Sequence, residues 1–147
     1  MIEFCSTETQ NEWLKLRSEL WSDDTEEDLQ LDIDDMLAEP DHFVQALFRL
    51  SDGEVAGFVE ASVRSDYVNG TSTTPVVFLE GIYVIPKHRG YGIAAKLIQF
   101  ITDWAIENGY SELASDVLLE NTESQQMHEA LGFEETERVV YYCKSLV

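Results

Sequence analysis

The chain has 147 residues, the length of one domain, and 44% of them are apolar and 11% aromatic, which excludes a disordered or fibrous protein. It contains 9 Lys and Arg against 29 Asp and Glu, so its formal net charge at pH 7 is −20. This charge argues against binding to nucleic acid or to an anionic membrane surface, and it favours cationic ligands or no more than solubility.

The amino-terminal third predicts one strand and two helices. Ile2–Cys5 is strand-like, and Thr7–Trp21 has apolar residues at helical spacing. A second helix is expected to begin at Thr25, whose hydroxyl can cap it, and to end before Pro40. Residues 23–39 hold nine acids and no base, which indicates either a solvated helix face or a segment that attracts a polycationic substrate.

The rest of the chain predicts a three-stranded meander followed by alternating strands and helices. Asp52-Gly53 is a hairpin turn signal, and Gly109 stands where a left-handed residue closes a helix. This order predicts the α/β class with a mixed sheet. The expected elements are strands over 43–50, 55–66 and 76–85, a helix over 93–108, a strand over 111–119, a helix over 122–131 and a strand over 138–144.

The cysteines and the amino terminus bear on the compartment. Cys5 and Cys143 show no metal-ligand spacing with each other or with the three histidines, so we expect two buried reduced thiols and no metal site. No apolar run approaches the roughly 18–20 residues of a membrane span. The first residues also lack the basic and apolar segments of a secretion signal. These features predict a cytoplasmic protein.

The strongest local feature is the segment between the strand over 76–85 and the helix over 93–108. Its small residues let a ligand approach the backbone, and the helix start offers free N–H groups. Lys87, His88 and Arg89 form the only dense basic cluster of the chain. The segment therefore predicts a pyrophosphate cradle, although it matches neither a Walker loop nor the three-glycine dinucleotide motif. The alternative is a tight turn whose glycines serve geometry alone.

Arg89-x-x-Gly92-x-Ala94, placed between a strand and a long helix, resembles the acetyl-CoA motif of the GNAT (GCN5-related N-acetyltransferase) superfamily. Asn121 followed by Leu131-Gly132-Phe133 is similar to the second motif of that family. The resemblance implies one acetyl-CoA-dependent domain over residues 1–147, with a mixed, mostly antiparallel central sheet flanked by about four helices. The residues that it assigns to the cofactor are Ile82, Tyr83, Val84, Arg89, Gly90, Tyr91, Gly92, Ile93, Ala94, Ala95 and Asn121.

Longer segments resemble the short, dimeric aminoglycoside 6′-N-acetyltransferases. They are Asp66–Gly70, Pro75–Ile82, Ala114–Asp116 and Gly132–Val139, with Leu20-Trp21-Ser22 near the amino terminus. The resemblance implies a homodimer that acetylates the 6′-amine of aminoglycosides and thereby confers antibiotic resistance. It also assigns Trp21, Tyr67 and Glu137 to the aminosugar pocket.

Two acids interrupt apolar strands and are candidate catalytic residues. Glu80 and Asp116 stand among apolar neighbours, where a carboxylate is costly unless it meets a cation or a hydrogen-bond donor. We interpret them as the pair that binds the substrate ammonium, with either able to take its proton. The alternative is two solvent-facing strand acids.

His128 occupies the position where many members of the family have the tyrosine that protonates the CoA thiolate. An imidazolium could donate the same proton, or His128 could pack or contact the cofactor. Neither cysteine lies in a motif, which favours direct transfer in a ternary complex over a covalent acetyl-enzyme. Two other functions remain open: acetylation of a polyamine or protein amine, and an acyl-CoA-binding sensor without turnover.

Overall fold

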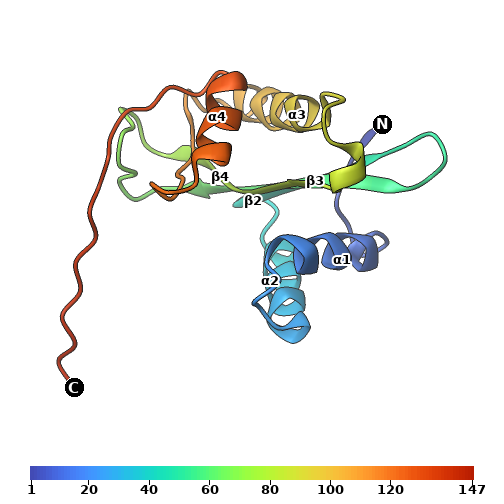
Figure 1. Cartoon of the computed structure of the whole chain (residues 1–147), viewed down its shortest axis with the longest axis horizontal. Helices are drawn as coiled ribbons and strands as arrows, with labels where there is room; N and C mark the ends of the chain where they lie inside the picture. Colours follow the sequence, from blue (N-terminus) through green and yellow to red (C-terminus); the bar gives the residue numbers. More distant parts are fainter.

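A five-stranded sheet with the order β1-β2-β3-β4-β5 forms the centre of the computed structural model, which describes all 147 residues (Figure 1). Neighbouring strands are antiparallel except β4 and β5, which run parallel, so the predicted mixed, mostly antiparallel sheet is confirmed. The elements in order are β1 (Ile2–Phe4), α1 (Gln10–Leu20), α2 (Glu26–Ala38), β2 (Phe43–Arg49), β3 (Val55–Arg64), β4 (Val76–Val84), the 3-10 turn η1 (Pro86–His88), α3 (Ile93–Glu107), β5 (Leu113–Ala114) and α4 (Thr122–Ala130).

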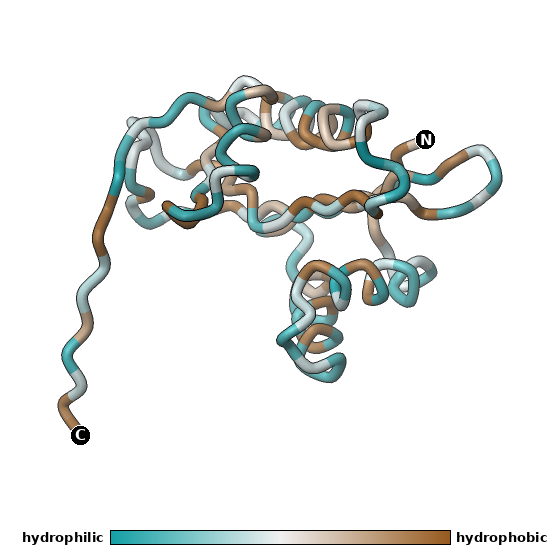
Figure 2. Tube along the Cα trace, in the orientation of Figure 1, coloured by the Kyte–Doolittle hydropathy of each residue, from teal (hydrophilic) through white to brown (hydrophobic).

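Helices cover both faces of the sheet. Helices α1 and α2 lie on one face, and α3 and α4 on the other (Figure 1). Each face has its own apolar cluster: Leu97 and Ile101 of α3 are buried with Val59 of β3, and Trp13 of α1 is buried with Phe58 on the opposite side. The alternation of side chains along β3 serves both clusters, which is why apolar residues run almost continuously through this strand (Figure 2).

Most predicted helices and caps are confirmed, with ends displaced by a few residues. The Thr25 hydroxyl accepts a hydrogen bond from the N–H of Asp28 at 3.1 Å and caps α2 as expected. Gly109 has a φ of 84° after the end of α3, in the left-handed region. None of the helices is both long and apolar enough to cross a membrane.

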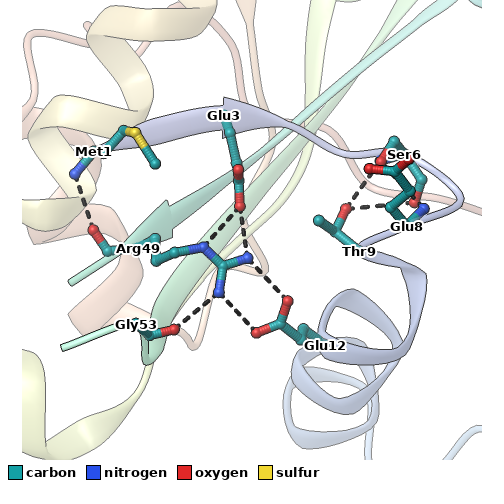
Figure 3. A network of polar contacts seen from close by, with 8 residues as sticks. All are labelled: Met1, Glu3, Ser6, Glu8, Thr9, Glu12, Arg49 and Gly53. Atoms are coloured by element: carbon teal, nitrogen blue, oxygen red, sulfur yellow. Dashed lines mark hydrogen bonds and ion pairs between the residues drawn. The ribbon is translucent and has the colours of Figure 1, made fainter. Parts of the chain in front are cut away.

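Arg49 ties the amino terminus to the sheet (Figure 3). Its guanidinium pairs with Glu3 of β1 at 2.6 Å and with Glu12 of α1 at 2.9 Å, and it donates to the Gly53 carbonyl at 2.8 Å. Hydrogen bonding to Arg49 lowers the pKa of Glu12 below its usual value. The amino group of Met1 donates to the Arg49 carbonyl at 2.9 Å. One side chain therefore joins β1, α1 and the β2–β3 turn.

A bulge interrupts the pairing of β3 with β4. Glu60 lies opposite Gly81 and Ala61 lies opposite Leu79, so Glu80 is an extra residue with no partner across the ladder. The extra residue shifts the alternation of β4. Leu79 packs on the α3 side, whereas Glu80 and Gly81 both face the α1 side, where they contact Ser62 and Trp21 respectively.

A buried ion pair joins α1 to β3 next to this bulge, on the α1 side of the sheet. Glu60 is only 2% exposed and accepts hydrogen bonds from Arg17 Nε at 2.7 Å, Arg17 Nη2 at 3.2 Å and Trp13 Nε1 at 2.7 Å. Arg17 Nη1 also donates to the Leu29 carbonyl of α2 at 2.9 Å. Burial raises the pKa of Glu60 and the contact with Arg17 opposes this rise. Every strong donor around the carboxylate is thus supplied by helix α1.

Two predicted strands are wrong for the isolated chain. The strand expected over 111–119 is reduced to β5, Leu113–Ala114, and the strand expected over 138–144 is absent. Residues 132–147 form neither helix nor strand, and the last part of this segment extends away from the body (Figure 1). The sequence pattern of a strand describes its faces, but a strand also needs a hydrogen-bonded neighbour, and this segment has none in its own chain.

The same segment carries the second cysteine. Cys5 is buried, as expected, and burial raises the pKa of its thiol. Cys143 is exposed because the end of the chain leaves the body, so the expectation of two buried thiols is wrong for this residue. Both cysteines are free.

Arg17→Met leaves the Glu60 carboxylate buried with Trp13 as its only remaining side-chain donor. We expect the free energy of unfolding in urea to fall by about 3–5 kcal/mol, because an uncompensated buried charge is costly. Arg49→Met breaks a more exposed pair and is the matched control, with an expected loss of about 1 kcal/mol. Equal losses in the two variants would contradict a special role of the buried pair.

Candidate functional site

The start of α3 offers backbone N–H groups that the chain does not use. Gly92 is the N-cap, with a φ of 79° and no capping side chain, and the first helical hydrogen bond runs from Lys96 N to the Gly92 carbonyl. Gly90 is also left-handed, with a φ of 88°. A Cβ atom at either glycine would meet nothing within 4 Å, so the space beside the backbone is open. A helix start of this kind suits an anionic group such as a pyrophosphate.

The basic cluster before α3 is partly neutralised within the chain. Glu54 of the β2–β3 turn contacts Lys87 Nζ at 3.0 Å and His88 Nε2 at 3.3 Å. Hydrogen bonding to these two side chains lowers the pKa of Glu54. Arg89 Nε donates to the Val84 carbonyl at 2.8 Å, which holds this side chain against the end of β4. The unpartnered N–H groups of α3 are therefore the most available anion-binding groups of this segment.

Strands β4 and β5 separate where the sequence places its two candidate acids. Their pairing ends at Phe78 opposite Ala114, and from Leu79 onwards this edge of β4 has no partner strand. Ile82–Val84 lie on the open edge and lead to the start of α3. The backbone groups of such an edge can pair with an extended ligand as with another strand.

A cavity of about 1990 Å³ lies beside this opening. It is enclosed by the end of β3, the loop over 65–71, one face of α3, the chain over 111–119, α4 and the segment over 132–141. The predicted site residues that line it are Tyr67, Ala95, Asp116, Asn121, His128 and Glu137. The cavity thus brings together residues from distant parts of the sequence.

Glu80 and Trp21 do not line the cavity and lie on the α1 side of the sheet. Trp21 packs on Gly81, where a Cβ atom would come within 2.6 Å of Trp21 Cη2. The Arg17 guanidinium lies 4.7 Å from the centre of the Trp21 ring. The predicted acid pair is therefore divided: Asp116 is in the cavity, and Glu80 is at the bulge.

Arg64 connects the two parts of the site, although sequence analysis did not single it out. It lines the cavity and pairs with Glu80 through Nη2 at 2.7 Å and Nε at 3.1 Å. Ser62 Oγ donates to the same carboxylate at 2.6 Å. The only sequence signal for these partners is their spacing of two on one strand, which places them on one face, but their meeting with Glu80 depends on the bulge.

His128 is held by hydrogen bonds at both ring nitrogens. Nδ1 lies 2.8 Å from the Ser124 carbonyl, which can only accept, so Nδ1 carries a proton. Nε2 lies 2.8 Å from Ser115 Oγ and therefore accepts from this hydroxyl when the ring is neutral. The Phe133 ring packs 5.1 Å away, centre to centre. Ser115 is a second cavity residue that sequence analysis missed.

Asn121 is the N-cap residue of α4. Its side-chain oxygen accepts a hydrogen bond from Ser124 N at 3.1 Å and caps α4.

Tyr67 is 73% exposed. Glu137 lies next to Thr136, which contacts Gly70 in the same loop as Tyr67. No group of three or more His, Cys, Asp or Glu side chains is placed to hold a metal ion.

Comparison with known proteins agrees with this geometry. Residues 8–133 match the family described as Acetyltransferase (GNAT) family. Aminoglycoside N(6′)-acetyltransferase type 1 of Serratia marcescens is 45% identical over 146 residues, covering 99% of each chain. The apo crystal structure of the aminoglycoside antibiotic 6′-N-acetyltransferase AAC(6′)-IG from Acinetobacter haemolyticus is 44% identical, with a TM-score of 0.93 over 100% of this chain and 99% of that one.

A further solved structure contains a ligand that spans both substrates. AAC(6′)-Iy in complex with the bisubstrate analogue CoA-S-monomethyl-acetylneamine is 42% identical, with a TM-score of 0.93 over 99% of this chain and 97% of that one. The similarity to both solved structures therefore extends over 99–100% of this chain.

Proposed function

Because this chain belongs to the GNAT acetyltransferase family, we propose that it transfers the acetyl group of acetyl-CoA to the 6′-amine of aminoglycoside antibiotics. The observation that carries the proposal is the full-length similarity to an enzyme solved with a CoA–aminoglycoside bisubstrate analogue. Acetylation removes a positive charge from the drug, and its consequence for the host would be antibiotic resistance.

The start of α3 and the open edge of β4 fit acetyl-CoA. The free N–H groups of residues 93–95 and the open space beside Gly90 and Gly92 would receive the pyrophosphate. The edge at Ile82–Val84 would run along the pantetheine, with the Val84 amide directed to the thioester carbonyl. Arg89 and Tyr91 would flank this path, and Asn121 would contact the cofactor further along it. When bound, acetyl-CoA supplies an acyl thioester that an amine can attack.

The acceptor side carries carboxylates for a polycationic substrate. Glu80 and Asp116 would bind the ammonium that reacts, and either can take its proton directly or through water. Trp21 offers an aromatic wall beside Glu80, and Tyr67 and Glu137 would contact the rest of the aminosugar. The net charge of −20 attracts such a substrate over a long range.

His128 is the proposed acid for the departing thiolate. In the imidazolium form, Nε2 would give its proton to the Ser115 hydroxyl while that hydroxyl gives its own proton to the thiolate, which leaves a neutral ring protonated at Nδ1. A CoA thiol resembles that of cysteine, with a pKa of about 8.5, so it needs little help to leave at neutral pH. The contribution of His128 is therefore expected to be modest.

We infer that the enzyme is a homodimer in which the carboxyl-terminal segments are exchanged. The segment over 138–144 has the sequence of a strand but no partner, and Tyr141 and Tyr142 are 81% and 92% exposed. The sheet ends at β5, whose outer edge is unpaired. The corresponding segment of a second copy could cover this edge and bury its aromatic side chains.

The use of acetyl-CoA and two free cysteines favour a cytoplasmic location.

Release of CoA from acetyl-CoA tests the reaction. We expect fast release with kanamycin or tobramycin, which have a 6′-amine, and little with paromomycin, which has a 6′-hydroxyl. Spermidine and a lysine peptide are the comparators, and mass spectrometry locates the acetyl group. Release only with spermidine or the peptide would indicate a polyamine or protein acetyltransferase. No release with any acceptor, despite tight binding of acetyl-CoA, would indicate a sensor.

Replacement of both Glu80 and Asp116 by Ala removes the proposed ammonium-binding groups. We expect kcat/KM for tobramycin to fall by roughly 10²–10⁴-fold, with the affinity for acetyl-CoA unchanged. Glu8→Ala combined with Glu107→Ala, which removes two exposed acids, is the control for the change of net charge. A double variant with near-normal turnover would refute the assignment.

Val140→Pro tests the exchanged segment. Proline removes an N–H donor and should prevent the segment from pairing as a strand, so the dimer should dissociate. Ser145→Pro lies beyond the predicted strand and should leave the dimer intact. The measurement is mass by light scattering during gel filtration, where a wild-type protein at the 16.8 kDa of one chain would exclude the dimer.

A further inference from the structure

We propose that Arg64 and Ser62 are positioning residues that present a single oxygen of Glu80, Oε2, to the acceptor amine. The inference rests on the proposed function, because it takes Glu80 as a carboxylate that binds the acceptor. It concerns two residues of β3 that hydrogen-bond to the Glu80 carboxylate. Their effect on the substrate would pass through the Glu80 side chain.

The hydrogen bonds of Glu80 are unevenly distributed. Ser62 Oγ donates at 2.6 Å, Arg64 Nη2 at 2.7 Å and Arg64 Nε at 3.1 Å, and all three reach Oε1. Oε2 receives no hydrogen bond from the chain. Because each oxygen of an ionised carboxylate can accept about two hydrogen bonds, Oε1 is saturated and Oε2 is available. A substrate ammonium can thus bind one oxygen only.

The donors are themselves held in place. Ser62 and Arg64 lie two residues apart on β3 and share the face to which the bulge turns Glu80. The Arg64 guanidinium lies 3.6 Å from the centre of the Phe78 ring, which restrains it from the other side. This arrangement fixes the plane of the carboxylate before any ligand arrives, and such preorganisation favours reactive geometry.

The exposure of the Arg64–Glu80 ion pair indicates that it positions the carboxylate more than it stabilises the fold. The side chains of Arg64 and Glu80 are 42% and 35% exposed. Ion pairs at this exposure contribute about 1 kcal/mol or less to folding. Arg17, which is buried with Glu60, contacts the neighbouring Trp21, so this part of the fold has a more deeply buried ion pair than that of Arg64 with Glu80.

Arg64 also limits what can approach. It lines the cavity that holds Asp116, and its Nε and Nη2 groups both donate to Oε1 of Glu80. A substrate ammonium therefore finds Oε1 already occupied and is left with Oε2. The same arginine therefore orients Glu80 and confines the substrate to its free oxygen.

The test compares Arg64→Met, Arg64→Lys and Ser62→Ala with the wild type, using tobramycin as acceptor. We expect Arg64→Met to lower kcat/KM for tobramycin by roughly 10–100-fold, with the KM for acetyl-CoA and the melting temperature nearly unchanged. Arg64→Lys should recover part of the loss, because it restores charge but only one point of contact. Arg49→Met, which breaks an arginine–carboxylate pair at β1, is the control.

A double-variant cycle separates positioning from a general effect of charge. In a Glu80→Gln background, adding Arg64→Met should cause little further loss, because both residues act through one carboxylate. Additive losses, or an Arg64→Met enzyme as fast as the wild type or faster, would overturn the inference while leaving the proposed function intact. A wild-type enzyme that neither binds nor acetylates tobramycin would overturn both.

Discussion

The bulge in β4 is the constraint on which the site depends. One extra residue opposite Glu60 and Ala61 places Glu80 and Gly81 on the same face of the sheet. Glycine at 81 admits the ring of Trp21, and the glutamate beside it reaches the end of β3. Without the extra residue, the strict alternation of a strand would send one of these two positions into the α3 core.

The buried ion pair makes the bulge a point of attachment for α1. Glu60 faces Gly81 across the ladder and accepts three hydrogen bonds from Arg17 and Trp13. Arg17 also lies under the ring of Trp21, so one guanidinium holds the helix and the aromatic wall together. An ion pair at this depth is weak evidence for stability but strong evidence for a specified geometry, because neither charge tolerates loss of its partner.

In the proposed function, the sheet would separate the two substrates until they meet at one edge. The α3 side provides free N–H groups and an unpaired β4 edge, and the α1 side provides Trp21 and Glu80. Arg64 connects the two sides of the sheet, since it lines the cavity and binds Glu80. Only the far end of the sheet is incomplete: β5 has two residues, and the last segment of the chain has no strand beside it. A chain that exposes adjacent tyrosines in this way has a surface suited to a second copy.

The sequence by itself determined the helices, the antiparallel meander, the cap at Thr25 and the glycine-rich start of α3. These features follow from local periodicity and backbone preference, which depend only on residues close together in the sequence. The family motifs added the cofactor path and the acceptor class. Only the tertiary structure decided that Asp116 lines the cavity whereas Glu80 does not, that Arg64 and Ser115 contact predicted site residues, and that Cys143 is exposed. Those outcomes depend on strand register and on which edge finds a partner, and hydrogen-bond pairing between distant segments leaves no trace in local sequence.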